Sequence, residues 1–282
     1  MNADQSASHP DTSLYIGDCR KVLPDLQSEY ARGVDLIFAD PPFNLEVNYD
    51  GWDDGLPRDE YLLFTYEWLD RCIDVLRPGG ALWVNIPEDT VSRIDVHLED
   101  RGMVRRKHCI KVFRFGQNTQ DNFITGHTHC LYFIKPGAKH TWNPEAVLVP
   151  SDRATKYNDS RTIGKSDGSP DGQRLPFDVW GVEGDGKYWG RVQGNNNERR
   201  PQHQNQLPEV YLERVIRSTS NPGDLVLDPF CGSGTTSTVA RALNRRSITI
   251  EVSPQSAESA WERIVNVGAV RVTDKTTLWG VA

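Results

Sequence analysis

The stretch Leu225-Val-Leu-Asp-Pro-Phe-Cys-Gly-Ser-Gly-Thr-Thr236 determines how the fold is interpreted. Its apolar start is typical of a buried strand and its end of a helix, with a glycine turn between them. A strand, a turn and a helix in this order belong to an α/β sheet. Glycine lets the backbone come close to a ligand, and the first turn of the following helix offers N–H groups to it. The stretch therefore predicts a ligand-binding turn.

Two common nucleotide-binding motifs do not match this turn. Walker A is excluded, because no lysine follows the second glycine, and the dinucleotide fingerprint is incomplete, because Ser237 stands in place of its third glycine. Glu251 ends the next predicted strand, where an acid takes the ribose hydroxyls of a bound nucleoside. The alternative is an ordinary glycine turn that ends beside an exposed glutamate.

A second stretch, Asp40-Pro41-Pro42-Phe43, directly follows the apolar run Val34–Ala39. Two prolines stiffen the loop and remove two N–H donors, so that carbonyls and one carboxylate can face a ligand. The Asp40 carboxylate and the Pro41 carbonyl both accept hydrogen bonds from an exocyclic amino group, while Phe43 stacks on its ring. A plain proline turn after a strand is the alternative.

The rest of the chain continues the α/β pattern on both sides of a loop-rich segment. We expect strands at Val34–Ala39, Ala81–Ile86, Lys107–Phe113, His129–Ile134, Asp224–Asp228 and Ser247–Glu251. We expect helices at Glu60–Leu76 (capped by Asp59), Ser92–Arg101, Pro208–Ser218, Thr235–Asn244 and Gln255–Val265. The predicted divisions are a catalytic half (14–136), an inserted recognition region (137–202) and a cofactor half (203–270).

Composition limits the class of protein. The 282 residues carry 32 Lys+Arg and 39 Asp+Glu, a net charge of −7, which argues against coating nucleic acid by bulk charge alone. Hydrophobic residues at 37% and charged residues at 25% indicate a globular chain rather than a disordered one. A polar N-terminus, the lack of a long apolar stretch and five cysteines without a C-x-x-C pair favour a reduced, cytoplasmic location without a membrane segment. His108-Cys109 and His129-Cys130 lack metal-ligand spacing, so we expect no metal.

The two stretches together resemble the amino-methylating DNA methyltransferases of the β arrangement, in which the catalytic motif precedes the cofactor motif. The resemblance runs from about residue 14 to 265. Tyr15-Ile-Gly-Asp18 resembles the segment whose acid contacts the cofactor adenine, and His203-Gln-Asn-Gln-Leu-Pro208 resembles a His-Pro-Thr-Gln-Lys-Pro element. Leu207 replaces the lysine of that element, which puts one contact to the cofactor tail or DNA in doubt. Thr128 stands where glutamate is frequent, so we assign it no role.

The resemblance implies a Rossmann-like sheet with helices on both faces and S-adenosylmethionine as the cofactor. The implied catalytic residues are Asp40, Pro41, Pro42 and Phe43. The implied cofactor-binding residues are Asp18, Asp40, His203, Asn205, Gln206, Asp228, Pro229, Phe230, Cys231, Gly232, Ser233, Gly234, Thr235, Thr236 and Glu251.

The implied reaction is methyl transfer to the exocyclic amino group of a flipped DNA base. Within the family, aspartate at the first catalytic position more often accompanies N6 of adenine, so adenine is the expected target and N4 of cytosine the alternative. Other hypotheses are a nicotinamide-dependent oxidoreductase, a DNA-binding module without catalysis and a methyltransferase of structured RNA.

Double-stranded DNA is the expected partner. The candidate DNA-binding residues are Arg105, Arg106, Lys107, Lys187, Arg191, Arg199 and Arg200. Lys111 and Arg114 extend the first of these clusters, although each basic residue could equally belong to a solvated face. A homodimer, since relatives are often dimers, and a cognate restriction endonuclease are further partners that the sequence itself does not identify.

Overall fold

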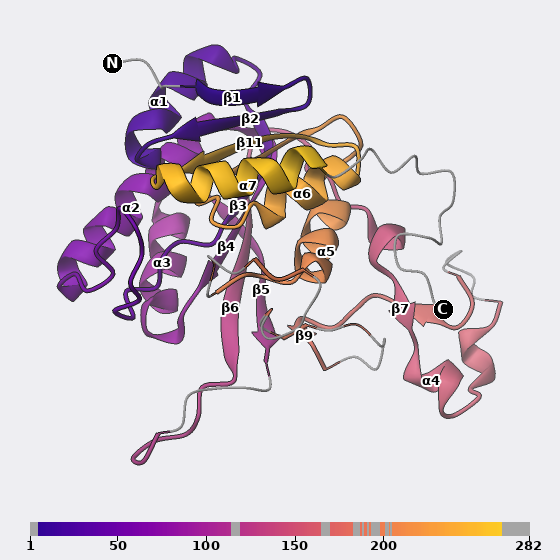
Figure 1. Cartoon of the computed structure of the whole chain (residues 1–282). Coiled ribbons are helices and arrows are strands. Elements are labelled where there is room, and N and C mark those ends of the chain that lie inside the picture. The colour runs from indigo at the N-terminus through magenta and orange to yellow at the C-terminus, as the bar shows by residue number, and fades with distance from the viewer. Residues whose placement is uncertain are drawn as a thin grey trace.

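A computed structural model describes residues 5–113, 119–164, 170–182, 187, 189–190, 192, 198–200, 203 and 205–266 of the chain, with side chains from residue 10 onward (Figure 1). A nine-stranded sheet runs through it in the order β1-β2-β11-β10-β3-β4-β6-β5-β9. Its strands are β1 (Gln5–His9), β2 (Thr12–Ile16), β3 (Val34–Ala39), β4 (Leu76–Ile86), β5 (Val104–Val112), β6 (His127–Ile134), β9 (Val179–Trp180), β10 (Leu225–Asp228) and β11 (Arg246–Glu251).

Helices cover both faces of this sheet, as expected. The first face carries α1 (Cys19–Glu29), α2 (Arg58–Val75) and α3 (Glu88–Asp100), whose apolar residues share one core cluster. The second face carries α5 (Glu209–Thr219), α6 (Thr235–Ala242) and α7 (Pro254–Asn266), with α7 drawn across the front of Figure 1. Because both faces are covered, the central strands are mostly apolar: β3 buries five of its six residues.

The strand order reverses at the centre of the sheet. β10 lies beside β3, and both are parallel to their outer neighbours β11 and β4. From β3 the chain crosses to β4 on one side, and from β10 it crosses to β11 on the other. Open α/β sheets bind ligands at the carboxyl ends of the strands at such a reversal. Here those ends lead directly into Asp40 and Asp228.

The start of α2 differs from the expectation. Asp59 does not cap the helix: Pro57 holds the capping position without a side-chain hydrogen bond, and Asp59 lies in the first turn. A carboxylate there still interacts favourably with the positive end of the helix dipole. β4 begins at Leu76, without the break expected before Ala81. The Pro-Gly-Gly segment forms a bulge in this strand, between the residue pairs Val34–Leu76 and Leu36–Ala81.

The segment expected to be one inserted region divides into two parts. Helix η1 (Pro144–Val147) packs against α5. A lobe that stands apart from the sheet is formed by β7 (Val149–Pro150), α4 (Asp152–Thr155), η2 (Ser160–Thr162) and β8 (Gln173–Arg174) (Figure 1). The next residues return to it, because β9 pairs with β5 and both Trp180 and Trp189 are buried in the core. No helix in the described part of the chain is long and apolar enough to cross a membrane.

Candidate active site

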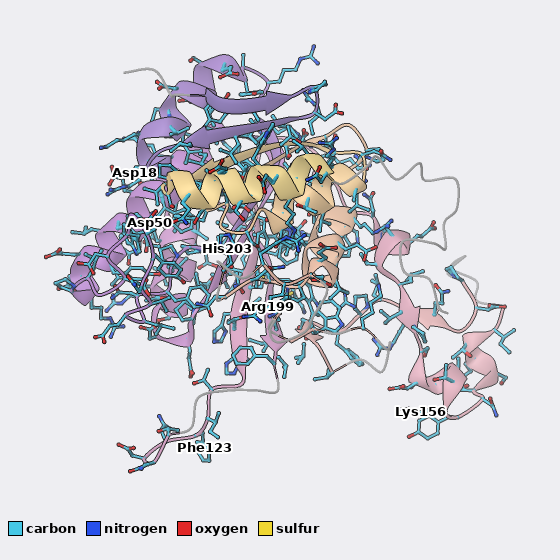
Figure 2. All side chains as sticks on the ribbon, in the orientation of Figure 1. Asp18, Asp50, Phe123, Lys156, Arg199 and His203 are labelled. Atoms are coloured by element: carbon cyan, nitrogen blue, oxygen red, sulfur yellow. The ribbon has the colours of Figure 1, made fainter. Side chains whose placement is uncertain are left out.

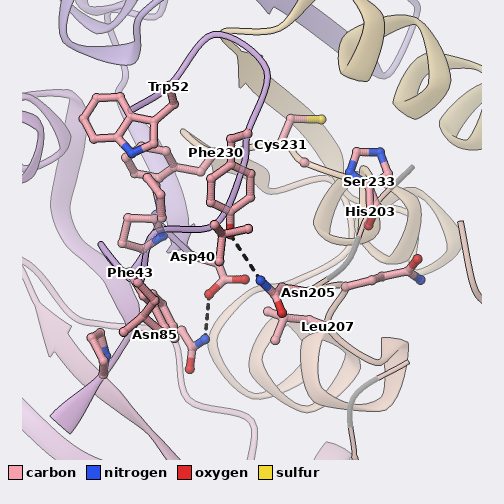
Figure 3. A pocket seen from close by; sticks show the side chains of 18 of the residues that line it. Asp40, Phe43, Trp52, Asn85, His203, Asn205, Leu207, Phe230, Cys231 and Ser233 are labelled. Carbon is pink, nitrogen blue, oxygen red and sulfur yellow. Dashed lines mark hydrogen bonds between the residues drawn. The ribbon is translucent and has the colours of Figure 1, made fainter. Parts of the chain in front are cut away.

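A large pocket opens where β3 and β10 end. Its volume is about 1850 Å³, and its lining includes all four residues of the predicted catalytic stretch, Asp40 to Phe43, and most of the glycine turn (Figure 3). Fourteen of the fifteen predicted cofactor-binding residues line it; Gly234 does not. Two stretches nearly 190 residues apart in sequence therefore share one cavity.

Asp40 is held in place by a chain of hydrogen bonds. Asn85 Nδ2, at the carboxyl end of β4, donates to Asp40 Oδ1 over 2.6 Å (Figure 3). The hydroxyl of the fully buried Tyr211 donates to Asn85 Oδ1 over 3.3 Å. Burial raises the pKa of Asp40 to about 6, although the Asn85 hydrogen bond and the charge of Lys111 oppose this rise. Asp40 is therefore mostly a carboxylate at neutral pH and can accept hydrogen bonds.

The loop after Asp40 has a defined shape. Tyr61 donates its hydroxyl proton to the Pro42 carbonyl over 2.7 Å. The buried Asp54 carboxylate accepts backbone hydrogen bonds from Asn44, Leu45 and Val47 at 2.8–3.0 Å. These bonds fix the backbone on both sides of Phe43, which lines the pocket.

The glycine turn places two buried acids beside the pocket. Glu251 accepts the Gly232 backbone N–H over 2.8 Å and the Ser253 N–H over 3.0 Å, one at each carboxylate oxygen. Asp228 accepts the Phe230 N–H over 3.0 Å. Burial raises the pKa of Asp228 to about 7, while a hydrogen bond from Thr236 opposes this rise. Burial also raises the pKa of Glu251.

Gly234 serves the packing of the turn rather than the pocket. Its φ is +73°, and an added Cβ would lie 3.2 Å from Ala260 and Ile264 of α7. Gly234 does not line the pocket, and its direct contact with the cofactor stays a prediction. Gly232, in contrast, faces open space, since an added Cβ would meet only the Phe230 carbonyl at 3.9 Å.

Asp18 also lines the pocket and is the N-cap residue of α1. Its carboxylate caps that helix and forms an ion pair with Arg20 at 2.6 Å. Burial acts to raise the pKa of Asp18, but the hydrogen bonds and charge of Arg20 outweigh it, and the pKa is lowered. Figure 2 shows Asp18 and Asp50 near one end of α7 and His203 below that helix.

The described residues of the element at 203–207 line the pocket, and their side chains differ in how firmly other groups hold them. Asn205 Nδ2 donates to the Tyr49 hydroxyl over 3.3 Å, so it links this element to the loop after Asp40 (Figure 3). Gln206 is buried and bonds to backbone groups of Glu198 and Arg200, which indicates a structural role. Burial lowers the pKa of His203, so its imidazole is neutral at pH 7.

The predicted DNA-binding residues are not brought together at the pocket. Arg105 pairs with Asp95 at 2.5 Å and Lys107 with Asp178 at 2.8 Å, both towards the start of β5 and away from Asp40. Lys187 lies 3.9 Å from Glu213. Arg106, Arg199 and Arg200 do not line the pocket, and Arg191 and Arg114 lie outside the described residues. DNA contact by these residues stays a prediction.

Two pocket residues, Asn85 and Lys111, and the buried Tyr211 that donates to Asn85 had not been singled out for this site. Asn85 is a polar residue at the end of the apolar strand Ala81–Ile86, and that contrast was a usable signal. Lys111 had been grouped with the surface bases, yet its side chain is only 2% exposed and lines the pocket. Tyr211 carried no signal, because an aromatic residue on an amphipathic helix resembles any core residue.

The histidine–cysteine pairs show no metal site. His108 and His129 hydrogen-bond to each other, with 2.8 Å between Nε2 and Nδ1. No group of three or more metal-ligating side chains is arranged around a common point in the described residues.

Comparison with known proteins agrees with this geometry. The sequence model of the N6_N4_Mtase family, described as DNA methylase, matches residues 34–262. The type II methyltransferase M.HpaI of Haemophilus parainfluenzae is 33% identical over 247 residues, which cover 87% of this chain and 73% of that protein. The DNA adenine methyltransferase YhdJ of Escherichia coli (strain K12) is 29% identical, with 86% and 80% covered.

Solved structures share the fold. The M1.HpyAVI–SAM complex superposes with a TM-score of 0.63 at 21% identity and covers 90% of this chain and 98% of that one. The cytosine-N4-specific PvuII DNA methyltransferase gives a TM-score of 0.66 at 17% identity, with 93% and 89% covered. At such identities the likeness concerns the fold alone.

Proposed function

This chain belongs to the N6/N4 DNA methylase family, and on that premise we propose that it transfers a methyl group from S-adenosylmethionine to N6 of an adenine flipped out of double-stranded DNA. One observation carries the proposal. The anchored carboxylate of Asp40 shares a pocket with the glycine turn that follows Asp228. The base side and the cofactor side of the reaction thus meet in one cavity.

The pocket residues fit the cofactor. The acids Asp18, Asp228 and Glu251 suit a molecule that carries a sulfonium, an ammonium and ribose hydroxyls. Both Glu251 oxygens keep a second lone pair for hydroxyl donors, and Gly232 leaves the backbone open to the pocket. When bound, S-adenosylmethionine supplies a methyl group on a positively charged sulfur.

In this proposal, Asp40 activates the amino nitrogen that accepts the methyl group. An aromatic amino nitrogen is a weak nucleophile, because its lone pair is delocalised into the ring. Hydrogen bonds from its two N–H groups to the Asp40 carboxylate and the Pro41 carbonyl favour a pyramidal nitrogen with a free lone pair. Asp40 also stabilises the positive charge that develops, and the surplus proton leaves through it or to water. Alignment of the two reactants supplies up to about 7–11 kcal/mol.

Two aromatic residues support a flipped base. Phe43 lines the pocket beside Asp40, and stacking on a base is worth about 1–3 kcal/mol. Phe123 is 95% exposed on the loop between β5 and β6, which projects beyond the sheet edge where β3 and β10 end (Figures 1 and 2). An apolar side chain in that place is suited to fill the gap that a flipped base leaves in the duplex.

Adenine is favoured over cytosine by two supports. Asp40 holds the first catalytic position, where the family more often has aspartate with adenine. One relative of 29% identity is named a DNA adenine methyltransferase. N4 of cytosine stays the alternative, since both bases present the same donor group. A homodimer and a restriction endonuclease partner also stay predictions, because no described face of the chain argues for either.

The test is incubation of the protein with S-adenosylmethionine and unmethylated duplex DNA, followed by mass spectrometry of the nucleosides. N6-methyladenine is expected, and Asp40→Asn should lower the rate by about 100-fold or more while the fold is kept. N4-methylcytosine would overturn the base assignment and keep the mechanism. Cofactor binding without a methylated DNA base would favour the non-catalytic module or an RNA substrate.

A further inference from the structure

Lys111 differs from every other basic residue of its strand. Arg105 and Lys107 point to acids near the surface, with side chains 43% and 55% exposed. The Lys111 side chain is only 2% exposed and reaches the active-site pocket. Its ammonium lies 5.6 Å from the ring centre of Tyr211 and 5.8 Å from that of Phe113. A buried ammonium is costly unless its charge is used.

The Lys111 charge acts on the catalytic carboxylate. Tyr211, whose ring faces the ammonium, donates to Asn85, which in turn donates to Asp40. Lys111 is also the cation that counters the effect of burial on the pKa of Asp40. Of the described residues that line the pocket, Arg20 is the other fixed cation, and Asp18 and Glu67 neutralise it.

The remaining ionisable groups around Asp40 oppose its charge. These groups are Asp228 on β10, Tyr61 on α2, Tyr211 on α5 and Cys130 on β6, each of which interacts electrostatically with Asp40. None of them supplies a positive charge at neutral pH. Leu207, where the resembling element has lysine, supplies none either.

We propose that Lys111 is a positioning residue that holds the Asp40 carboxylate in its anionic, hydrogen-bond-accepting form once a base covers the pocket. This inference rests on the proposed function. A base that enters the pocket expels water, and desolvation favours the protonated acid. A protonated Asp40 would offer an O–H donor to an amino group that needs acceptors. The Lys111 charge, screened little by the buried surroundings, opposes that protonation.

The experiment compares pH–rate profiles of single-turnover methylation, with enzyme and S-adenosylmethionine in excess over a duplex substrate. The test variant is Lys111→Met, which fills the same buried space without charge. Lys111→Arg keeps the charge, and Lys107→Met removes a lysine from the same strand that pairs with Asp178 far from the pocket. Asp40→Asn identifies which part of the profile reports Asp40.

The acid limb of the wild-type profile is expected near pH 6. Loss of the cation raises the pKa of Asp40, so the acid limb of Lys111→Met should move up by about one pH unit. The rate at pH 6 then falls several-fold, and most of it returns by pH 8.5. Lys111→Arg and Lys107→Met should keep the pH of the wild-type limb, even if loss of the predicted DNA contact of Lys107 lowers the rate equally at every pH.

A limb that stays in place in Lys111→Met, or a rate that falls equally at every pH, would overturn the inference. Infrared difference spectra of the Asp40 carboxyl, with Asp40→Asn as the reference, give a readout independent of turnover and should show the same upward shift. If Lys111→Met does not fold, Lys111→Gln is subject to the same two measurements. The proposed function fails separately, when the wild-type protein forms no methylated adenine.

Discussion

The negative charge of Asp228 lowers the stability of the folded chain. Its carboxyl is buried, and burial raises its pKa to about 7. Because the folded state holds this proton more tightly than the unfolded chain, the carboxyl destabilises the fold increasingly as the pH rises from about 4 through 7. Sites that bind charged ligands often carry such a cost.

Asp228→Asn should therefore stabilise the protein and weaken its binding of the cofactor. The amide oxygen can still accept the Phe230 N–H, and the buried charge is gone. Thermal unfolding at pH 8 should show a melting temperature higher by about 2–4 °C, a gap that closes towards pH 4. Calorimetric titration should show binding of S-adenosylmethionine weakened by about 10-fold or more. A lower melting temperature at pH 8 would mean that the carboxylate stabilises the fold.

At the scale of elements, the junction between the glycine turn and α6 depends on one close approach. Gly234 has φ +73° and lies against α7. Gly234→Ala should lower the free energy of unfolding by about 1–3 kcal/mol, because alanine is strained at a positive φ and its Cβ would lie 3.2 Å from Ala260 and Ile264. We expect a melting temperature lower by about 5 °C and weaker cofactor binding, because the start of α6 moves.

The matched control for this effect is Gly102→Ala. Gly102 has φ +77°, and an added Cβ would meet no atom within 4 Å. That variant has the backbone strain without the contacts, so the free energy of unfolding should fall by about 1 kcal/mol and cofactor binding should stay unchanged. Equal losses of stability in both variants would show that the α7 contact adds nothing.

The loop between β5 and β6 is expected to act on the duplex and not on the cofactor. Phe123→Ala should reduce the methylation rate on paired DNA by about 10-fold, and far less on a duplex in which the target adenine is mismatched. Fluorescence of 2-aminopurine at the target position reports flipping directly. Phe177→Ala, which removes an exposed phenylalanine stacked on Arg174, is the control. Equal losses on paired and mismatched DNA would contradict a role in flipping.

The elements that could be predicted from sequence were those with a strong periodic or turn signal. β3 was predicted to the residue, because its apolar run stops at two prolines. The cap of α2 and the start of β4 were wrong, since tertiary packing decided them and not local propensity. β9 was missed, because a two-residue strand carries no periodicity and depends on pairing with β5.

Site residues followed the same division. Asp40 and Asp228 stand in turn motifs that can be recognised from the sequence alone. Lys111 could not be separated from Lys107, since both lie on the same face of β5 and differ only in what packs over them. Tyr211 of α5 packs over Lys111, which no local pattern predicts.

At the scale of the molecule, we expect the lobe and the sheet to have different functions. The described residues of the lobe, 149–164 and 170–174, stand apart from the sheet, whereas Trp180 and Trp189 belong to the core and contact Arg214. An exchange of residues 149–174 for those of a relative with another target should change the methylated sequence and preserve cofactor affinity. Sequencing of methylated sites in a random DNA library measures the first, and calorimetry the second. An unchanged sequence preference would show that recognition lies elsewhere.

A wider exchange serves as the comparison. Replacement of 137–202 also removes Trp180 and Trp189 from the core, so we expect insoluble or unstable protein. Loss of two large buried aromatic side chains costs several kcal/mol. Equal stability of both exchanges would contradict the division between lobe and sheet.

The pairing of β3 with β10 also sets the order of events at the ribosome. Leu36 pairs with Val226, so the centre of the sheet joins residues from the first and last thirds of the chain. At about 5–20 residues per second, β3 waits on the order of 10–40 s after its synthesis for its neighbour. During that time its open edge offers unpaired N–H and C=O groups to any other nascent strand. We expect slower synthesis over this interval to lower the yield of folded protein, and a chain that ends before β10 to form no methylated DNA, since it lacks both this strand and the glycine turn.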